Sequence, residues 1–328
     1  MNAPLSSPHL PVRPTVAGLM RRVLIAMIPG TAAMVICFGI GVLVNLLVAL
    51  LAALATEAVL LRLRQRPLQP FITDWTAVLT AALFALALPP LAPWWLTALG
   101  AAIAIALGKQ LYGGLGQNPF NPAMVGYVVV LISFPTELTY WTPQPVGIGA
   151  SLQAQFGAAD RALLDGLTGA TPLDALRSGL AQAQLVNEAI GGLAGRWGWA
   201  WINGGFLLGG LWLVVKRDIS WRIPLAVLAG MGLTALLFWL IDSDRYASPW
   251  FHWSSGAAML GAFFIATDPV SGATTPRGKL IFGAGIGVLV YVIRSWGGYP
   301  DGMAFAVLLM NLTVPLLDAH TQPRVYGR

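Results

Sequence analysis

The sequence has few charged residues, one cysteine and three histidines. Of its 328 residues, 10% are charged and 57% are hydrophobic. In a soluble protein about a quarter of the residues are charged, so this shortage of charge indicates an integral membrane protein. Cys37 alone cannot form an internal disulfide or ligate an iron–sulfur cluster. The scattered histidines disfavour haem and zinc. We expect no metal site and no catalytic side chain, so any redox chemistry would need an organic cofactor.

Long apolar runs divide the chain into two halves around one polar stretch. Residues 23–61 are long enough for two crossings at about 20 residues each, with a turn at 39–41. Further apolar runs cover about 75–88, 94–107, 122–134, 199–215, 223–240, 254–266, 280–293 and 303–317. We therefore predict a cytoplasmic tail (1–20), a first transmembrane half (21–134), a periplasmic or outer loop (135–197), a second transmembrane half (198–318) and a cytoplasmic tail (319–328).

A faint repeat indicates how the two halves are related. The Gly-Gly pairs in residues 112–114 and 296–298 each lead through a Pro-containing loop to an apolar helix. The first pair lies on the expected inner face and the second on the outer face, which is typical of inverted repeats. Gly-Gly is also common in membrane loops. The net charge of +6 gathers at segment ends, which indicates orientation rather than nucleic-acid binding. The fold class is all-α and polytopic, with about ten transmembrane helices in two inverted five-helix repeats and both termini cytoplasmic.

Residues 165–171 of the outer loop read Asp-Gly-Leu-Thr-Gly-Ala-Thr. Gly169 would allow a sharp turn, and small neighbours would leave the Thr171 hydroxyl easy for another enzyme to reach. The segment is similar to the acceptor motif of flavin transferases, which esterify FMN through its phosphate to the last threonine. On that interpretation Thr171 is a cofactor anchor, and Asp165, Thr168, Gly169 and Ala170 complete the motif. The competing interpretation is an ST-turn or a helix cap before the next proline.

The same pattern occurs a second time, in residues 268–274. Its last residue, Thr274, falls in a short loop on the predicted inner side, close to Arg277 and Lys279. Flavin transferases of this type resemble exported proteins, and a tight turn offers them little room. We therefore assign FMN to Thr171, and we interpret Thr274 as part of a turn and helix start, which the prolines at 269 and 276 favour.

Two further runs carry a resemblance that covers nearly the whole chain. They are Ile-Ala-Thr-Asp-Pro-Val at 265–270 with Thr-Pro-Arg-Gly-Lys-Leu-Ile-Phe-Gly at 275–283, and Ser-Trp-Gly-Gly-Tyr-Pro-Asp-Gly-Met-Ala-Phe-Ala at 295–306. With the 165–171 motif, they make the chain resemble the D subunits of Rnf electron-transport complexes (ferredoxin:NAD oxidoreductases). More distantly, it resembles the B subunits of sodium-pumping NADH:quinone reductases. Gly272 departs from the small residue often found there in the family, and this departure creates the second motif.

The resemblance implies a multi-pass protein of the bacterial inner membrane. Such a protein holds FMN by a phosphothreonyl bond and relays electrons, within a complex that couples ferredoxin/NAD chemistry to Na⁺ or H⁺ translocation. The chain would be one part of this translocase and not active alone. Its implied partners are the other Rnf subunits (membrane and peripheral, including iron–sulfur and second flavin subunits), a flavin transferase and membrane lipid, with no nucleic acid. The resemblance leaves open whether a second, non-covalent flavin is bound.

Four other residues are candidates for weaker roles. Tyr299 and Asp301 lie on the predicted outer face, where they could hold the flavin or line an exit. An ionisable group at membrane depth is a candidate for an ion pathway, which applies to Glu57 and, at a helix end, to Asp74. The simpler interpretation is that Glu57 snorkels to the inner interface or pairs with an arginine, and that Asp74 is an interface charge.

Two rival functions stay open on the sequence. A secondary transporter with no redox cofactor would also have inverted repeats and Gly/Pro-broken segments. A purely structural assembly protein is the third alternative, in which loss of the flavin would leave electron transfer intact. Flavin fluorescence of the denatured protein that is lost in Thr171→Ala would separate the first function from a transporter.

Overall fold

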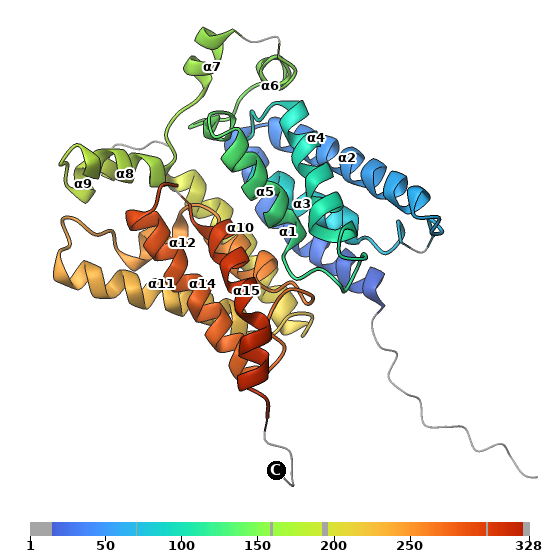
Figure 1. Cartoon of the computed structure of the whole chain (residues 1–328). Coiled ribbons are helices and arrows are strands. Elements are labelled where there is room, and N and C mark those ends of the chain that lie inside the picture. The colour runs from blue at the N-terminus through green and yellow to red at the C-terminus, as the bar shows by residue number, and fades with distance from the viewer. Residues whose placement is uncertain (1–14, 70, 158–159, 192–195, 300, 324–328) are drawn as a thin grey trace, which may run out of the picture.

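A computed structural model describes residues 15–69, 71–157, 160–191, 196–299 and 301–323. Within these residues the protein is helical, and an isolated bridge between Gly39 and Val146 is the one strand-like pairing. Figure 1 shows two groups of helices, one from each half of the chain, with the segments of the polar loop gathered at one end of the molecule. The predicted all-α fold is confirmed.

The first half contains five apolar helices, close to where the sequence predicts them. They are α1 (Val16–Phe38), α2 (Gly41–Leu63), α3 (Thr76–Ala87), α4 (Trp94–Ile103), which continues as a π-helix over Ala104–Gln110, and α5 (Pro122–Ser133). The predicted turn at 39–41 is present because Gly39 has a φ of 95°, a value that side chains disfavour. Asn121 caps α5 by accepting a hydrogen bond from the Met124 N–H.

The second half differs from prediction at one segment. Its helices are α10 (Arg196–Val215), α11 (Arg222–Ile241), α12 (Pro249–Ser254), α13 (Ala258–Leu260) with a π-helix over Gly261–Ile265, α14 (Pro276–Trp296) and α15 (Met303–His320). The helix predicted over 254–266 is confirmed over 258–265, but its predicted start is wrong. The chain breaks there because Ser255 is extended and Gly256 has a φ of 59°, and side chains from other segments bind the freed backbone groups, as described below.

The polar loop carries more helix than the sequence indicates. A 3₁₀ turn (Glu137–Thr139) is followed by α6 (Ile148–Gln155), α7 (Arg161–Leu167), α8 (Pro172–Ala181) and α9 (Val186–Gly191). In Figure 1, α8 and α9 lie against the second half, whereas α6 and α7 lie above the first.

In the part of the chain that the structure describes, six helices are long and apolar enough to cross a membrane: α1, α2, α10, α11, α14 and α15. Two shorter apolar helices, α3 and α5, accompany them. These features indicate a multi-pass membrane protein. The count of ten crossings, the inversion of the repeats and the cytoplasmic termini stay predictions.

Glycines bring the longest helices into close contact. A Cβ atom on Gly209 of α10 would lie 1.7 Å from the Ala26 carbonyl oxygen of α1, and one on Gly287 of α14 would lie 2.2 Å from the Val227 carbonyl oxygen of α11. These glycines belong to Gly205-x-x-x-Gly209 and Gly283-x-x-x-Gly287, a spacing that allows close helix contact.

Candidate functional site

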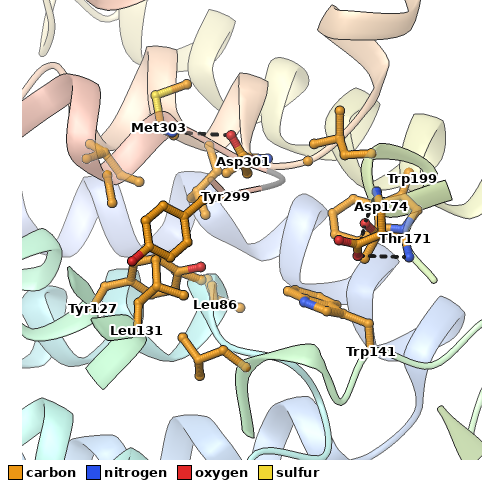
Figure 2. A pocket seen from close by; sticks show the side chains of 18 of the residues that line it. Leu86, Tyr127, Leu131, Trp141, Thr171, Asp174, Trp199, Tyr299, Asp301 and Met303 are labelled. Carbon is orange, nitrogen blue, oxygen red and sulfur yellow. Dashed lines mark hydrogen bonds between the residues drawn. The ribbon is translucent and has the colours of Figure 1, made fainter. Parts of the chain in front are cut away.

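A cavity of about 270 Å³ lies between the two halves, next to the polar loop. Its wall is mostly apolar and aromatic, as is typical of sites for organic ligands. Figure 2 shows side chains that converge on it from both halves. The polar and aromatic side chains on the wall include Tyr127, Trp141, Thr171, Asp174, Trp199, Tyr299 and Asp301.

Thr171 lies on this wall as the N-cap of α8. Its hydroxyl donates to Asp174 Oδ2 over 2.6 Å and accepts from the Asp174 N–H over 3.2 Å, while the Thr171 N–H donates to the same carboxylate oxygen over 3.2 Å. This reciprocal arrangement is a capping box. The predicted helix cap at Thr171 is thus confirmed. A capping role is compatible with a cofactor anchor, because the same residue also lines the cavity.

The expectation that the Thr171 hydroxyl is easy to reach is wrong for the folded loop. Thr171 is only 9% exposed, because the segment before it packs against residues 141–143. The Gly169 N–H donates to the Trp141 carbonyl oxygen over 2.8 Å, and a Cβ on Gly169 would lie 3.2 Å from Pro143. The expected sharp turn is also absent, since residues 168–171 form neither a turn nor a bend, and Thr168 and Thr171 are extended. The glycine instead allows a close approach between two loop segments.

The rest of the acceptor motif lies outside the cavity wall. Asp165 is exposed on α7, Thr168 is the C-cap of that helix, and Ala170 is exposed. Of the motif residues, Thr171 alone lines the cavity. By contrast, the structure brings Tyr299 and Asp301, from the distant second half, to the same cavity as Thr171.

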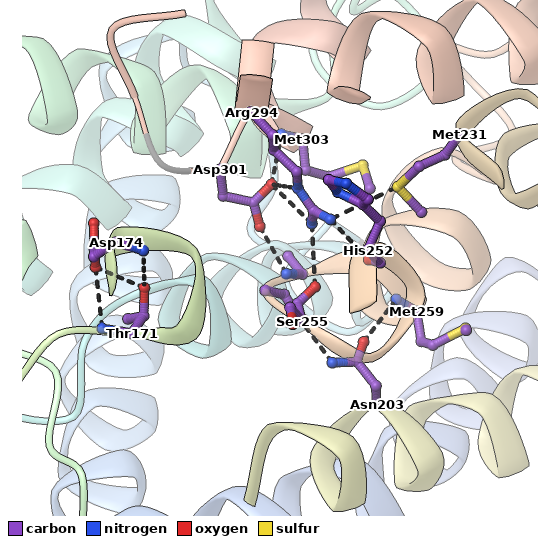
Figure 3. A network of polar contacts seen from close by, with 12 residues as sticks. Thr171, Asp174, Asn203, Met231, His252, Ser255, Met259, Arg294, Asp301 and Met303 are labelled. Carbon is purple, nitrogen blue, oxygen red and sulfur yellow. Dashed lines mark hydrogen bonds and ion pairs between the residues drawn. The ribbon is translucent and has the colours of Figure 1, made fainter. Parts of the chain in front are cut away.

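Asp301 is held in place by Arg294, as Figure 3 shows. Its Oδ1 accepts from Nε and Nη2 of Arg294, each over 3.2 Å, and its Oδ2 accepts from the Ala257 N–H over 2.7 Å. Arg294 also donates to the carbonyl oxygens of His252 and Ser255. These bonds satisfy the backbone groups that the break between α12 and α13 sets free, so Asp301 is a fixed part of the cavity wall.

His252 lies behind this network, in the short helix α12. Its imidazole is buried, with 3% of the residue exposed. Burial first, and the nearby Arg294 charge second, lower the pKa of His252 to about 3. The imidazole is therefore neutral at physiological pH.

Aromatic rings form the part of the wall near the polar loop. The rings of Trp141 and Trp199 lie 5.0 Å apart, and Phe38 contacts both edge-on. Trp199 lies on the cavity wall next to the polar loop. The sequence did not single out Trp141, Tyr127 or Asp174. Only Asp174 had a readable signal, the Thr-x-x-Asp spacing of a capping box.

Glu57 and Asp74 belong to one hydrogen-bonded cluster away from the cavity. Lys109 Nζ donates to Glu57 Oε1 over 2.5 Å and to Thr76 Oγ1 over 2.6 Å, and the Thr76 hydroxyl donates to Asp74 Oδ1 over 2.6 Å. The fully buried Glu57 neither snorkels nor pairs with an arginine, so that expectation is wrong. Lys109 and Thr76 line a second cavity of about 100 Å³.

The second threonine motif has a different environment. Thr274 is exposed, and its hydroxyl donates to Asp318 Oδ2 of α15 over 2.8 Å. The next residue, Thr275, caps α14, and Pro276 takes the first helical position. The predicted turn and helix start are therefore confirmed. Thr274 lines neither of the two cavities.

Comparison with known proteins gives consistent matches over the whole length. The model of the NQR2, RnfD, RnfE family matches residues 4–327. A protein of Ectopseudomonas mendocina, named as the D subunit of an ion-translocating oxidoreductase complex, is 53% identical over 98% of this chain and 95% of the relative. Proteins of the same name from Alcanivorax borkumensis and Vibrio cholerae are 50% and 49% identical, over 98% of this chain and 96% and 98% of the relatives.

Proposed function

The chain belongs to the NQR2, RnfD, RnfE family, and on this basis we propose that it is the D subunit of an ion-translocating oxidoreductase complex. In this proposal the protein sits in the bacterial inner membrane, carries FMN esterified to Thr171 and relays electrons between other subunits. The complex would couple ferredoxin/NAD redox chemistry to the movement of Na⁺ or H⁺.

One observation carries the flavin assignment: Thr171 lines an apolar, aromatic cavity. A phosphoester on its oxygen would leave the rest of the cofactor next to a space that can receive a planar ring system. Thr274 has the same surrounding sequence but lies on neither cavity. The two motifs are equal in sequence, so the cavity is what favours Thr171.

The residues around the cavity fit such a cofactor chemically. Trp141 and Trp199 offer aromatic faces beside the anchor, and flat rings interact well with such faces. Tyr299 and Asp301 add polar groups from the second half. When bound, the flavin supplies the electron-transfer chemistry, while the protein holds it, orients it and shields it from water.

Ion movement through this chain is a separate part of the proposal. Glu57 and Asp74 are the residues through which the chain would contact the ion, because one hydrogen-bonded cluster joins the buried Glu57 to Lys109 and, through Thr76, to the half-buried Asp74. Buried ionisable groups at membrane depth often mark such pathways.

A covalent flavin also separates this function from a transporter. The full chain is produced together with a flavin transferase, denatured, separated on a gel and viewed for flavin fluorescence. We expect a fluorescent band for the wild type and for Thr274→Ala, and no fluorescence for Thr171→Ala. Equal fluorescence in Thr171→Ala, or a dark wild-type band, would contradict the proposal; the dark band would favour a transporter.

A further inference from the structure

We propose that Asp174 accepts the proton of the Thr171 hydroxyl when the flavin is attached. This inference rests on the proposed function, because it concerns how the phosphoester at Thr171 is made. Asp174 lies three residues beyond the 165–171 motif. Its role comes from the contacts of its carboxylate with the reacting oxygen.

The two oxygens involved are close. Thr171 Oγ1 lies 2.6 Å from Asp174 Oδ2, which is the range of a strong hydrogen bond from a hydroxyl to a carboxylate. The Thr171 and Asp174 N–H groups close the reciprocal cap around the pair, as Figure 3 shows. The carboxylate is therefore held on the atom that would attack phosphorus.

The chemistry needs a proton acceptor at this oxygen. A threonine hydroxyl is a weak nucleophile that an adjacent base activates. With FAD as the donor, Thr171 Oγ1 forms a bond to the FMN phosphorus, and the bond from that phosphorus to the bridging oxygen breaks. AMP leaves with the bridging oxygen, and the hydroxyl proton passes to Asp174 Oδ2. Nothing is oxidised or reduced.

The pair can act outside the folded cavity because it is local. Thr171 is 9% exposed, so a transferase can reach it only if the loop has moved away or has not yet packed. Opening the loop breaks contacts between segments, such as the Gly169 N–H bond to Trp141. The Thr171–Asp174 bonds belong to the first turn of one ten-residue helix, so base and nucleophile stay together.

Thr274 provides a contrast within the same chain. Its hydroxyl also donates to a carboxylate, but Asp318 lies 44 residues away on α15. If the turn around Thr274 moved away from α15 to be modified, its hydroxyl would lose contact with the Asp318 carboxylate. The locality of the base is thus a physical difference between two motifs of the same sequence pattern, and it favours modification of Thr171.

The charges around Asp174 are few. Asp301 shares its cavity and is neutralised by Arg294, and Arg177 follows on the same helix. The other ionisable groups on the facing wall are the phenols of Tyr127 and Tyr299. Asp174 is the only one of these groups for which the structure shows a hydrogen bond to the Thr171 hydroxyl, among the residues it describes.

The test measures attachment rate against pH on the full chain in detergent. Protein made without transferase is incubated with transferase and FAD, and covalent fluorescence is followed from pH 6 to 9. We expect Asp174→Asn, which keeps the shape of the cap, to be slower by about 100-fold or more at neutral pH, with a rate that rises steeply with pH. The wild-type rate, normalised to transferase activity on an unrelated acceptor, should be nearly flat.

Asp160→Asn is the matched control, because Asp160 caps the neighbouring helix α7 from the same loop. It should react at the wild-type rate. If Asp174→Asn reacts like the wild type, or more slowly but with the wild-type pH profile, Asp174 is not the base. If the wild type carries no flavin even when it is produced together with the transferase, the proposed function itself fails, so the two failures are distinct.

Discussion

Arg294 and Asp301 form the ion pair that closes the second half around the cavity. The guanidinium of Arg294 has a side chain only 1% exposed, and its Nη2 lies 3.2 Å from Asp301 Oδ1. Removing the carboxylate would leave a buried cation without its partner. We expect Asp301→Ala to lower the free energy of unfolding by about 3–5 kcal/mol, measured by thermal or denaturant unfolding in detergent.

The control for this pair is an exposed one. Arg245 and Asp242 lie 3.7 Å apart, and their side chains are 80% and 39% exposed. Arg245→Ala breaks this pair and keeps the backbone hydrogen bonds to the Asp242 carboxylate, so it should have little effect on unfolding, since solvent screens such pairs. If the two alanine variants unfold alike, Asp301 does not organise the cavity wall.

The pair of Glu57 and Lys109 should behave as a coupled unit. Lys109→Met leaves the buried Glu57 carboxylate without its cation, and we expect about 3–5 kcal/mol of destabilisation. The double variant Glu57→Leu/Lys109→Met removes both charges and should recover much of the loss. A double-mutant cycle of unfolding free energies measures this coupling. Strictly additive effects would contradict the buried ion pair.

The close packing of α1 against α10 predicts different effects on stability for alanine substitutions at two glycines of α10. Gly209→Ala would place a methyl group 1.7 Å from the Ala26 carbonyl oxygen, whereas Gly204→Ala meets nothing within 4 Å. We expect the first to destabilise the protein by about 1–3 kcal/mol through overpacking. The second should be neutral or slightly stabilising because alanine favours helix. The midpoints of thermal unfolding compare them, and the reverse order would be inconsistent with this helix contact.

Acid should destabilise the network around His252. Its folded pKa is about 3, below the value of about 6.5 for an unfolded histidine. The unfolded state therefore binds the proton more readily, so stability is unaffected above pH 6.5 and falls as the pH drops from 6.5 toward 3. The slope reaches about 1.4 kcal/mol per pH unit. The free energy of unfolding is measured from pH 7 to 5 for the wild type and for His252→Gln. The variant should lack the part of the pH dependence that comes from His252.

The helix positions could be read from the sequence because apolar runs of membrane length have few other structures available. The turn at 39–41 and the starts of α5 and α14 follow from glycine, asparagine and proline at fixed places. The break within 254–266 could not be read, because it depends on Arg294 and Asp301 from distant segments. Local sequence does not encode partners of that kind.

The candidate site was predictable only in part. The motif and the topology pointed to Thr171, Tyr299 and Asp301 as candidates, and the structure brings all three to one cavity. The burial of Thr171 and the lysine partner of Glu57 were missed. Both arise from packing between segments far apart in sequence, Trp141 against Gly169 and α2 against the π-helix at Lys109.

The most direct test of the account is peptide mass spectrometry of protein produced with its transferase. The two peptides of interest cover residues 161–177 and 268–279, one for each threonine motif. The account predicts the mass of one FMN, less one water, on the first peptide at Thr171 and an unmodified second peptide. An unmodified first peptide, or FMN on Thr274 instead, would contradict it.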